Sequence, residues 1–404
     1  MIFLRVFIPF ALGYFLSYLF RAVNNVIAPN LVADMGLDAA DLGLLTSTYF
    51  LTFAAFQLPL GILLDRFGPR RTEAVLLLFA ALGAFLFAVA DSTLGLIVGR
   101  AFIGFGVSAC LMAAFKAFGM WFSAGRLPLI NGCQMAAGGI GALTATVPVE
   151  MALGTTDWRG VFMVLAVLTA AVAVVIFAIV PERRAEPGGG NLAEQVRGFG
   201  EVFSSPVFWR IVPLTVTTQA GFISIQSLWS GPWLRDVAGL DRAVVADHLF
   251  LIATAMITGF IFIGAIAERL GRLGVRPEFV SVGGMTVFMG FQGLVISGWT
   301  GETELLWFLY GFFGTAGILP YATLPQSFAP RLSGRVITAA NVLVFVLAFA
   351  GQWGVGAVID LWPETATGYA PAAYRVAFGM VVALQVAALA WWMVSIRRRG
   401  FADD

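Results

Sequence analysis

The chain has 404 residues, of which 59% are hydrophobic and 12% charged, and its 24 basic and 23 acidic residues nearly cancel. This composition excludes an ordinary soluble domain, and the charge balance provides no basic surface for nucleic acid. Lys116 is the one lysine, so no P-loop of the GxxxxGK[ST] type exists, and the two cysteines suggest neither a disulfide framework nor a metal site. We therefore expect a protein of the lipid bilayer that is not an enzyme and uses no cofactor or metal.

Long apolar runs predict an all-α membrane protein with twelve transmembrane helices. About 20 apolar residues cross the hydrocarbon core of a bilayer as a helix. Runs of this kind lie at residues 6–31, 43–65, 73–91, 94–119, 128–150, 158–180, 207–232, 245–267, 277–297, 304–328, 336–361 and 372–395. The connections between them are short and leave no room for a soluble catalytic domain.

One longer connection divides the chain into two halves. We predict a first six-helix bundle at 1–180, a cytoplasmic linker at 181–206 and a second six-helix bundle at 207–404. The linker contains four apolar residues spaced as on one helix face: Leu192, Val196, Phe199 and Phe203. This spacing indicates an amphipathic helix on the membrane surface, and a helix that docks a partner protein is the alternative.

Arginine placement predicts the orientation in the membrane. The arginines concentrate on one set of loops and at both ends of the chain, where Arg5 and Arg397–Arg399 lie. By the positive-inside rule, this side and both termini are cytoplasmic. The use of arginine in place of lysine is typical of GC-rich bacteria, so we expect a bacterial inner (plasma) membrane protein. We also expect a monomer.

A short motif occurs once in each half and carries a family resemblance. The segment Gly61-x-x-x-Asp65-Arg66-x-Gly68-x-Arg70-Arg71 returns in altered form at 264–271, with Glu268 and Arg269. The first copy resembles the signature loop between helices two and three of the major facilitator superfamily, and the segments 100–106 and 157–162 are similar to its fourth-helix and sixth-helix patterns. The resemblance implies the major facilitator fold, with two pseudo-symmetric bundles, a central cavity and alternating access.

The same resemblance implies a set of gating residues. In that family the loop acid caps a neighbouring helix on the cytoplasmic side, which suggests a gate formed by Asp65, Arg66, Arg70, Glu268 and Arg269. Arg100 is either a coupling residue or a packing residue bonded to carbonyl groups. Lys116 either forms a gating salt bridge or extends its amine to the membrane interface.

Arg21 is the strongest candidate for binding a substrate. It lies near the middle of the first run, on a helical face that also carries Tyr18, Asn24 and Asn25. A polar stripe on an apolar helix faces protein or a water-filled cavity. A guanidinium there can bind a carboxylate or phosphate through two hydrogen bonds. The alternative is a structural arginine bonded to backbone carbonyls.

The residues around Arg21 extend the resemblance. Tyr18-Leu19-Phe20-Arg21 is similar to the first helix of the organophosphate:phosphate antiporters and the organic anion:cation symporters, where the matching arginine binds the substrate anion. The seventh run has no arginine in its core to act as a second phosphate ligand. Phe20 replaces the aspartate common in the symporters, and the fourth run lacks their glutamate. We therefore expect a singly charged organic anion rather than a phosphate dianion.

Further polar residues inside the runs are candidates for the same cavity. Singly, each is more typical of a hydrogen bond between helices, whereas together they suit a site for a small polar molecule. They are Tyr49, Gln57, Gln134, Gln226, Trp229, Tyr310, Asn341 and Gln352.

Acidic residues are scarce within the runs. Glu73 lies at the edge of the third run, and Glu150, Asp247 and Asp360 lie near outer ends, with His248 beside Asp247. Proton coupling through a buried carboxylate therefore has few candidates, and anion exchange or facilitated diffusion fits equally well. The coupling partner, a counter-ion or an exchanged anion, stays open.

These features predict a secondary active transporter that moves a small organic anion of carboxylate or sugar-acid type. Two alternatives remain. The first is a multidrug exporter of the same fold, and the second is a transporter-like receptor for a sugar phosphate.

Overall fold

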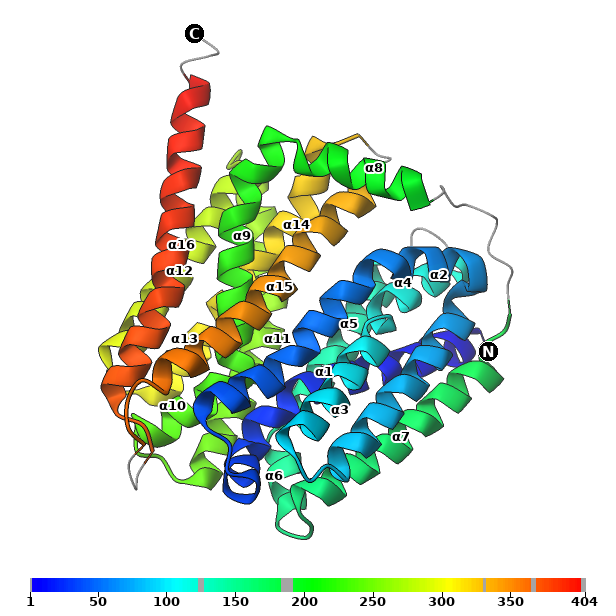
Figure 1. The fold of residues 1–404 in the computed structure, drawn as a ribbon. Helices are drawn as coiled ribbons and strands as arrows, with labels where there is room; N and C mark the ends of the chain where they lie inside the picture. Colours follow the sequence, from blue (N-terminus) through cyan, green and yellow to red (C-terminus); the bar gives the residue numbers. More distant parts are fainter. Residues whose placement is uncertain (1, 123–126, 183–191, 330–331, 365–367, 401–404) are drawn as a thin grey trace. The chain divides into compact units, whose positions relative to one another are not determined.

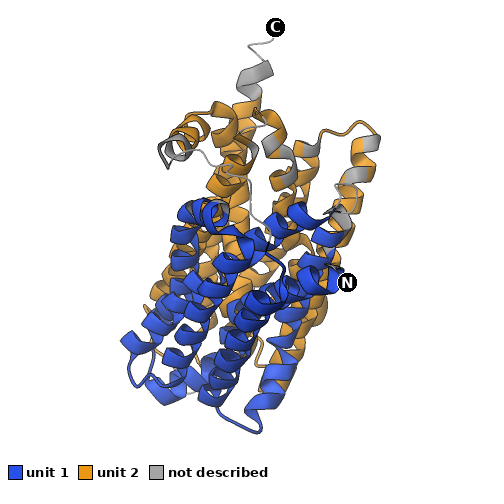
Figure 2. Ribbon diagram, turned by 90° about the vertical axis from the view of Figure 1, so that its right-hand side faces the viewer, with its two compact units in different colours: residues 1–190 blue, residues 191–404 orange. Residues whose placement is uncertain are grey.

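The computed structural model describes residues 2–122, 127–182, 192–329, 332–364 and 368–400, which are almost entirely helical (Figure 1). The chain divides into two compact units, Met1–Gly190 and Asn191–Asp404 (Figure 2). The boundary between them lies inside the segment we predicted as a linker.

Unit 1 contains the first six predicted runs. The long α2 holds the second and third runs, α3 and α4 together form the fourth, and α5 and α6 the fifth. The elements are α1 (Ile2–Met35), α2 (Ala39–Ala88), α3 (Thr93–Val107), α4 (Cys110–Trp121), α5 (Leu127–Thr144), α6 (Val147–Leu153) and α7 (Trp158–Ile179).

Unit 2 begins with α8 and contains the last six runs. Its elements are α8 (Leu192–Phe203), α9 (Pro206–Ser224), the π-helical turn η2 (Ile225–Trp229), α10 (Ser230–Asp236), α11 (Arg242–Arg272), α12 (Pro277–Ser297), α13 (Thr303–Gly314), the 3₁₀ turn η3 (Thr315–Ile318), α14 (Leu319–Thr323), the 3₁₀ turn η4 (Leu324–Ser327), α15 (Ser333–Ile359) and α16 (Pro371–Gly400). Among the described residues, ten helical stretches are individually long and apolar enough to cross a membrane. The seventh and tenth predicted runs are the two that π and 3₁₀ turns divide into shorter helices.

The turn between the second and third runs depends on one glycine. Gly68 has φ 78° and ψ 164°, a backbone conformation that side chains with a Cβ rarely adopt. It separates two helical segments that are otherwise continuous in α2, so the motif glycine sets the direction change between these runs.

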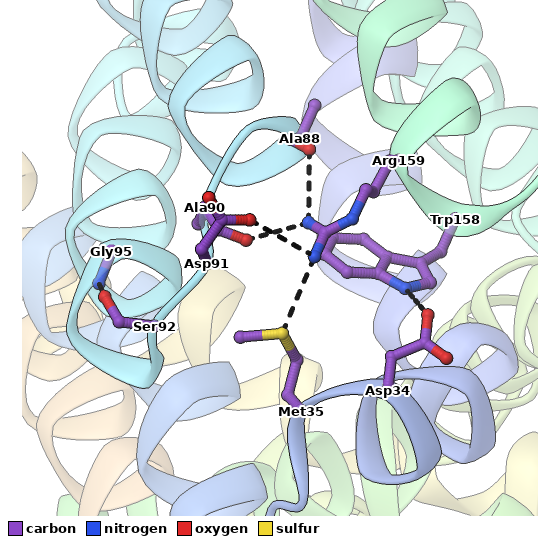
Figure 3. Close-up of polar contacts among 9 residues, drawn as sticks. All are labelled: Asp34, Met35, Ala88, Ala90, Asp91, Ser92, Gly95, Trp158 and Arg159. Carbon is purple, nitrogen blue, oxygen red and sulfur yellow. Dashed lines mark hydrogen bonds and ion pairs between the residues drawn. The ribbon is translucent and has the colours of Figure 1, made fainter.

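Two clamps hold the ends of unit 1 together. At one end, the indole Nε1 of Trp158 donates to Asp34 Oδ2 at 2.7 Å, and Arg159 Nη1 donates to the carbonyl oxygens of Ala88 and Ala90 at 3.3 and 2.8 Å (Figure 3). These bonds join the start of α7 to the end of α1 and to the α2–α3 turn. They also satisfy carbonyls at the C-terminus of α2 that have no partner within the helix.

The opposite clamp joins the Gly68 turn to the end of α7. Arg70 donates to the Phe177 carbonyl oxygen through Nε at 2.8 Å and Nη2 at 2.5 Å. Arg70 and Arg71 both pair with the Glu182 carboxylate, and the Arg70 Nη1–Oε2 distance is 3.6 Å. The arginines of the repeated motif therefore fasten helices within unit 1.

The amphipathic helix forms, but its C-terminal half packs on protein. Val202 is fully buried in a cluster with Phe208 and Val336, and Phe199 packs against the same cluster. At these positions α8 covers α9 and α15, while Phe203 of the predicted apolar face is exposed. The membrane-surface role of α8 stays a prediction. The side chains of Leu192 and Val196 lie outside the described part of the structure.

Gly83→Ala should lower the free energy of unfolding. A Cβ at Gly83 would lie 2.7 Å from both the Gly99 oxygen and the Ile103 nitrogen, so the α2 and α3 backbones would have to separate. Overpacking of this kind costs about 1–3 kcal/mol, measurable as a lower Tm of the purified protein. Gly119→Ala is the control because nothing lies within 4 Å of its added Cβ; equal Tm values for both variants would contradict the packing argument.

Candidate functional site

Arg21 lies on α1, partly buried among aromatic rings of unit 1. Its guanidinium carbon is 4.5 Å from the centroid of the Tyr18 ring and 5.7 Å from that of Phe53. The Tyr49 hydroxyl is its side-chain hydrogen-bond partner, and that hydroxyl donates to the Ser17 carbonyl oxygen at 3.2 Å. Aromatic faces and one hydroxyl thus fix the position of the charge.

A second arginine contacts the same tyrosine. Arg100, on α3, is 1% exposed, and its guanidinium carbon lies 5.3 Å from the Tyr49 ring centroid. Its Nη1 donates to the Phe20 carbonyl oxygen at 2.9 Å, as in the packing alternative raised for this residue. Among the described residues, no carboxylate pairs with Arg100. Tyr49 therefore contacts two cationic side chains, and no described carboxylate offsets the charge of Arg100.

The asparagines predicted beside Arg21 are buried in unit 1. Asn24 Nδ2 donates to Thr46 Oγ1 on α2 at 3.1 Å, and Asn25 is 6% exposed. Tyr18 is partly buried, and its ring lies 5.1 Å from that of Tyr14. The structure thus brings Arg21, Tyr18 and Tyr49 together and uses Asn24 to link α1 to α2.

Two predicted amides of unit 1 connect helices. Gln57 Nε2 on α2 donates to the Ser108 carbonyl oxygen at 3.2 Å. Gln134 Nε2 on α5 donates to the Phe10 carbonyl oxygen on α1 at 3.1 Å. Both side chains are buried and bond to backbone carbonyls of other helices, which is the interhelical role that each residue taken singly suggests.

Predicted residues of unit 2 fall into two hydrogen-bonded groups. Trp229 Nε1 donates to the Gln352 carbonyl oxygen at 2.9 Å, and Gln352 Nε2 donates to Ser227 Oγ at 3.0 Å. These bonds join η2 to α15. Separately, the Tyr321 hydroxyl donates to Asn341 Oδ1 at 3.4 Å, and Asn341 is partly buried.

Two further candidates in unit 2 have different surroundings. Tyr310 is fully buried among Phe222, Phe288 and Trp307, with ring centroids 5.0–5.8 Å away. This aromatic packing keeps Tyr310 within the core of unit 2. Gln226, in η2, is partly buried.

The structure describes the side chains of some predicted gating residues but not of others. The side chains of Asp65 and Glu268 lie outside the described part, whereas Arg66 and Arg269 are exposed and Lys116 is partly buried. Arg66, Arg70 and Arg71 line a hollow of about 540 Å³ at the Gly68 end of unit 1, together with Ala117, Trp121 and Glu182. This hollow places a cluster of arginines at that end.

Sequence reasoning missed the burial of Glu73. It is fully buried on α2, and among the described residues neither carboxyl oxygen has a nitrogen or oxygen donor. The signal was present in the spacing, because Leu77, Ala80 and Ala84 follow at i+4, i+7 and i+11 and are also buried. The Asp247–His248 neighbours behave differently, since Asp247 is exposed while His248 is buried with Nε2 2.9 Å from Thr303 Oγ1.

The helical arrangement and the motif positions match a known family. A family model described as Major Facilitator Superfamily matches residues 10–352. The chain belongs to the major facilitator superfamily. This confirms the expected twelve-helix fold, and it makes the chain a membrane transporter rather than an enzyme.

Individual relatives lie at low identity. The chain is 25% identical over 295 residues to "Probable sulfoacetate transporter SauU" of Cupriavidus necator, a match covering 70% of this chain and 68% of the relative. It is 22% identical over 374 residues to "Probable L-galactonate transporter" of Escherichia coli K12, covering 85% and 80%. Among solved structures, a D-xylose–proton symporter superposes with a TM-score of 0.77 at 16% identity, covering 97% of both chains. This last match shows the fold alone.

Gln57→Met should destabilise unit 1 and leave ligand affinity unchanged. The substitution removes the donor to the Ser108 carbonyl and leaves that oxygen without this bond, at a cost of about 1–3 kcal/mol. A thermal melt without ligand measures the loss, and the ligand-induced rise in Tm measures affinity. An unchanged melt together with a lost ligand response would instead place Gln57 in the binding site.

Proposed function

We propose that this transporter moves a small, singly charged organic anion across a bacterial inner membrane by alternating access. The substrate class is a carboxylate or sugar acid, and Arg21 is the residue that binds its anionic group. The observation that carries the proposal is that two arginines, Arg21 and Arg100, both contact Tyr49.

The electrostatics of this pair favour an anion. Arg100 holds a positive charge in the low-dielectric interior, where the Phe20 carbonyl is its hydrogen-bond acceptor and no described carboxylate offsets the charge. An anion near Tyr49 would offset this charge as well as that of Arg21, and the attraction is stronger there than in water. A cationic drug would meet two positive charges, which argues against the multidrug exporter.

The two arginines have different roles in this proposal. Arg100 is almost fully buried and bonded to a backbone oxygen, so it contributes to the local potential without touching the substrate. Arg21 is partly buried, and its guanidinium lies over the Tyr18 ring. This planar group can donate two hydrogen bonds to a carboxylate. A single binding arginine suits a single negative charge.

The names of two of the relatives that match over more than two thirds of their length support a carboxylate substrate. L-galactonate is a sugar acid with one negative charge, and sulfoacetate is a carboxylate with a second negative charge on its sulfonate, so the names support the carboxylate and not the number of charges. Asn341 and Gln226 of unit 2 remain predicted binding residues, and the Tyr321 hydroxyl donates to Asn341. We assign the Gly68 end of unit 1, with Arg66 and Arg70, to the cytoplasmic gate on the side of both termini.

Arg21→Gln should abolish anion binding and uptake. Removing one partner of a buried charge pair costs about 2–5 kcal/mol, which weakens binding roughly 30-fold or more. A screen of organic acids, sugar acids, phosphate esters and neutral analogues by thermal shift identifies the ligand, and uptake into proteoliposomes measures transport. Arg5→Gln removes the same charge from an exposed site near the N-terminus and is the matched control.

The opposite result would have a defined meaning. If anions stabilise the Arg21→Gln protein as much as the parent, Arg21 is structural and the site assignment is wrong. If only neutral or cationic compounds raise the Tm, the exporter replaces the anion transporter. A phosphate ester that binds without being transported would favour the receptor.

A further inference from the structure

Glu73 is a buried acid that the binding site described above does not use. Its carboxyl group lies against Gly13 of α1, where any Cβ would collide with Oε1, and against the Cys110 thiol of α4. The side chain of Ile176, on α7, borders the same position. Glu73 is thus enclosed by helices α1, α4 and α7 of its own unit.

No cation offsets this carboxyl group among the described residues. The nearest basic residues on its own helix, Arg70 and Arg71, pair with Glu182, and Arg70 also donates to the Phe177 carbonyl. On α4, Lys116 is six residues beyond Cys110, roughly 9 Å along the helix. On α1, the neighbouring titratable side chain is Tyr14, whose hydroxyl donates to Met135 Sδ at 3.6 Å.

An ionised carboxylate without a partner is expensive to bury, and the group takes up a proton instead. The enclosed geometry therefore accommodates the neutral carboxyl group. An ionised Glu73 would need water or a hydrogen-bond donor next to its carboxylate. The contact with Gly13 leaves no room for either on that side unless α1 moves away from α2 and α4. Loss of the proton is thereby linked to a change in helix packing.

We propose that Glu73 is the site at which this transporter binds and releases a proton that travels with the substrate anion. The inference rests on the proposed function and adds the coupling ion to it. The carboxylate takes up a proton from water while its site is open on one side of the membrane and remains the neutral acid while the site is closed. The proton returns to water when the site opens on the other side. One proton with one monoanion makes the transport cycle electroneutral.

The position of Glu73 relates it to the hollow at the Gly68 end and to Arg21. Arg70 lines that hollow, and Glu73 lies one helical turn beyond Arg70 on the same helix. Gly13 and Arg21 are eight residues apart on α1, roughly 12 Å along one helix. A movement of α1 that exposes Glu73 therefore also displaces the anion site.

Glu73→Gln tests the proposal because glutamine keeps the shape of the neutral acid and cannot titrate. In proteoliposomes loaded at higher pH than the bath, the parent protein should accumulate the anion found by the thermal-shift screen, roughly tenfold for a gradient of one pH unit. Glu73→Gln should still exchange labelled for unlabelled anion but show no accumulation driven by the gradient. A pH dye inside the vesicles should report proton entry with substrate for the parent only.

Two variants and three outcomes make the test decisive. Glu302→Gln, which removes an exposed carboxylate, should accumulate like the parent, and Glu73→Asp, which still titrates, should keep gradient-driven uptake if the glutamine variant fails to fold. Accumulation by Glu73→Gln equal to the parent would overturn the proposal. A parent that exchanges anions but ignores the pH gradient would also overturn it, while leaving the anion transporter intact. A parent that neither binds nor exchanges anions would show that the proposed function itself is wrong.

Discussion

The carbonyl oxygens of α1 are the points on which the polar interior of unit 1 depends. In a low-dielectric environment, a buried donor must find an acceptor within the protein. Three donors from three other helices find theirs on α1: Gln134 bonds to Phe10, Tyr49 to Ser17, and Arg100 to Phe20. These bonds tie α5, α2 and α3 to the helix that carries Arg21. The packing of the bundle and the position of the candidate binding residue therefore share one set of interactions.

Two of the motifs that resemble the family lie at the ends of this bundle, whereas a third places Arg100 in its interior beside Tyr49. Trp158 and Arg159 fasten one end, and Arg70 and Arg71 fasten the other. In the proposed mechanism, substrate and proton bind between the two clamps, at Arg21, Tyr49 and Glu73. The clamps then hold the helix ends while the interior binds the ligand.

The sequence predicted the number and positions of the helices well, because bilayer thickness imposes a length that hydropathy detects directly. It did not predict the π and 3₁₀ turns that divide the seventh and tenth runs, since local backbone geometry leaves no mark on hydropathy. It predicted Arg21 and Tyr49 as binding residues, and the structure brings the two together. It could not show that Gln57, Gln134 and Gln352 form hydrogen bonds between helices. A buried amide has the same composition whether it bonds to a carbonyl or to a ligand, and only three-dimensional contacts separate the two.

Glu73 and Arg100 are an acidic and a basic residue of one unit that do not pair with each other. Gly13, which contacts Glu73, and Phe20, which accepts from Arg100, are seven residues apart on α1, roughly 10 Å. A direct ion pair would neutralise both groups permanently and make each unavailable to a ligand or proton. Because the two side chains are apart, the arginine can stabilise a bound anion and the carboxylate can bind a proton. A bound monoanion and a bound proton together leave the net charge of the interior unchanged. The anion then offsets an arginine and the carboxyl group is neutral, which lowers the cost of enclosing these groups in a low-dielectric interior.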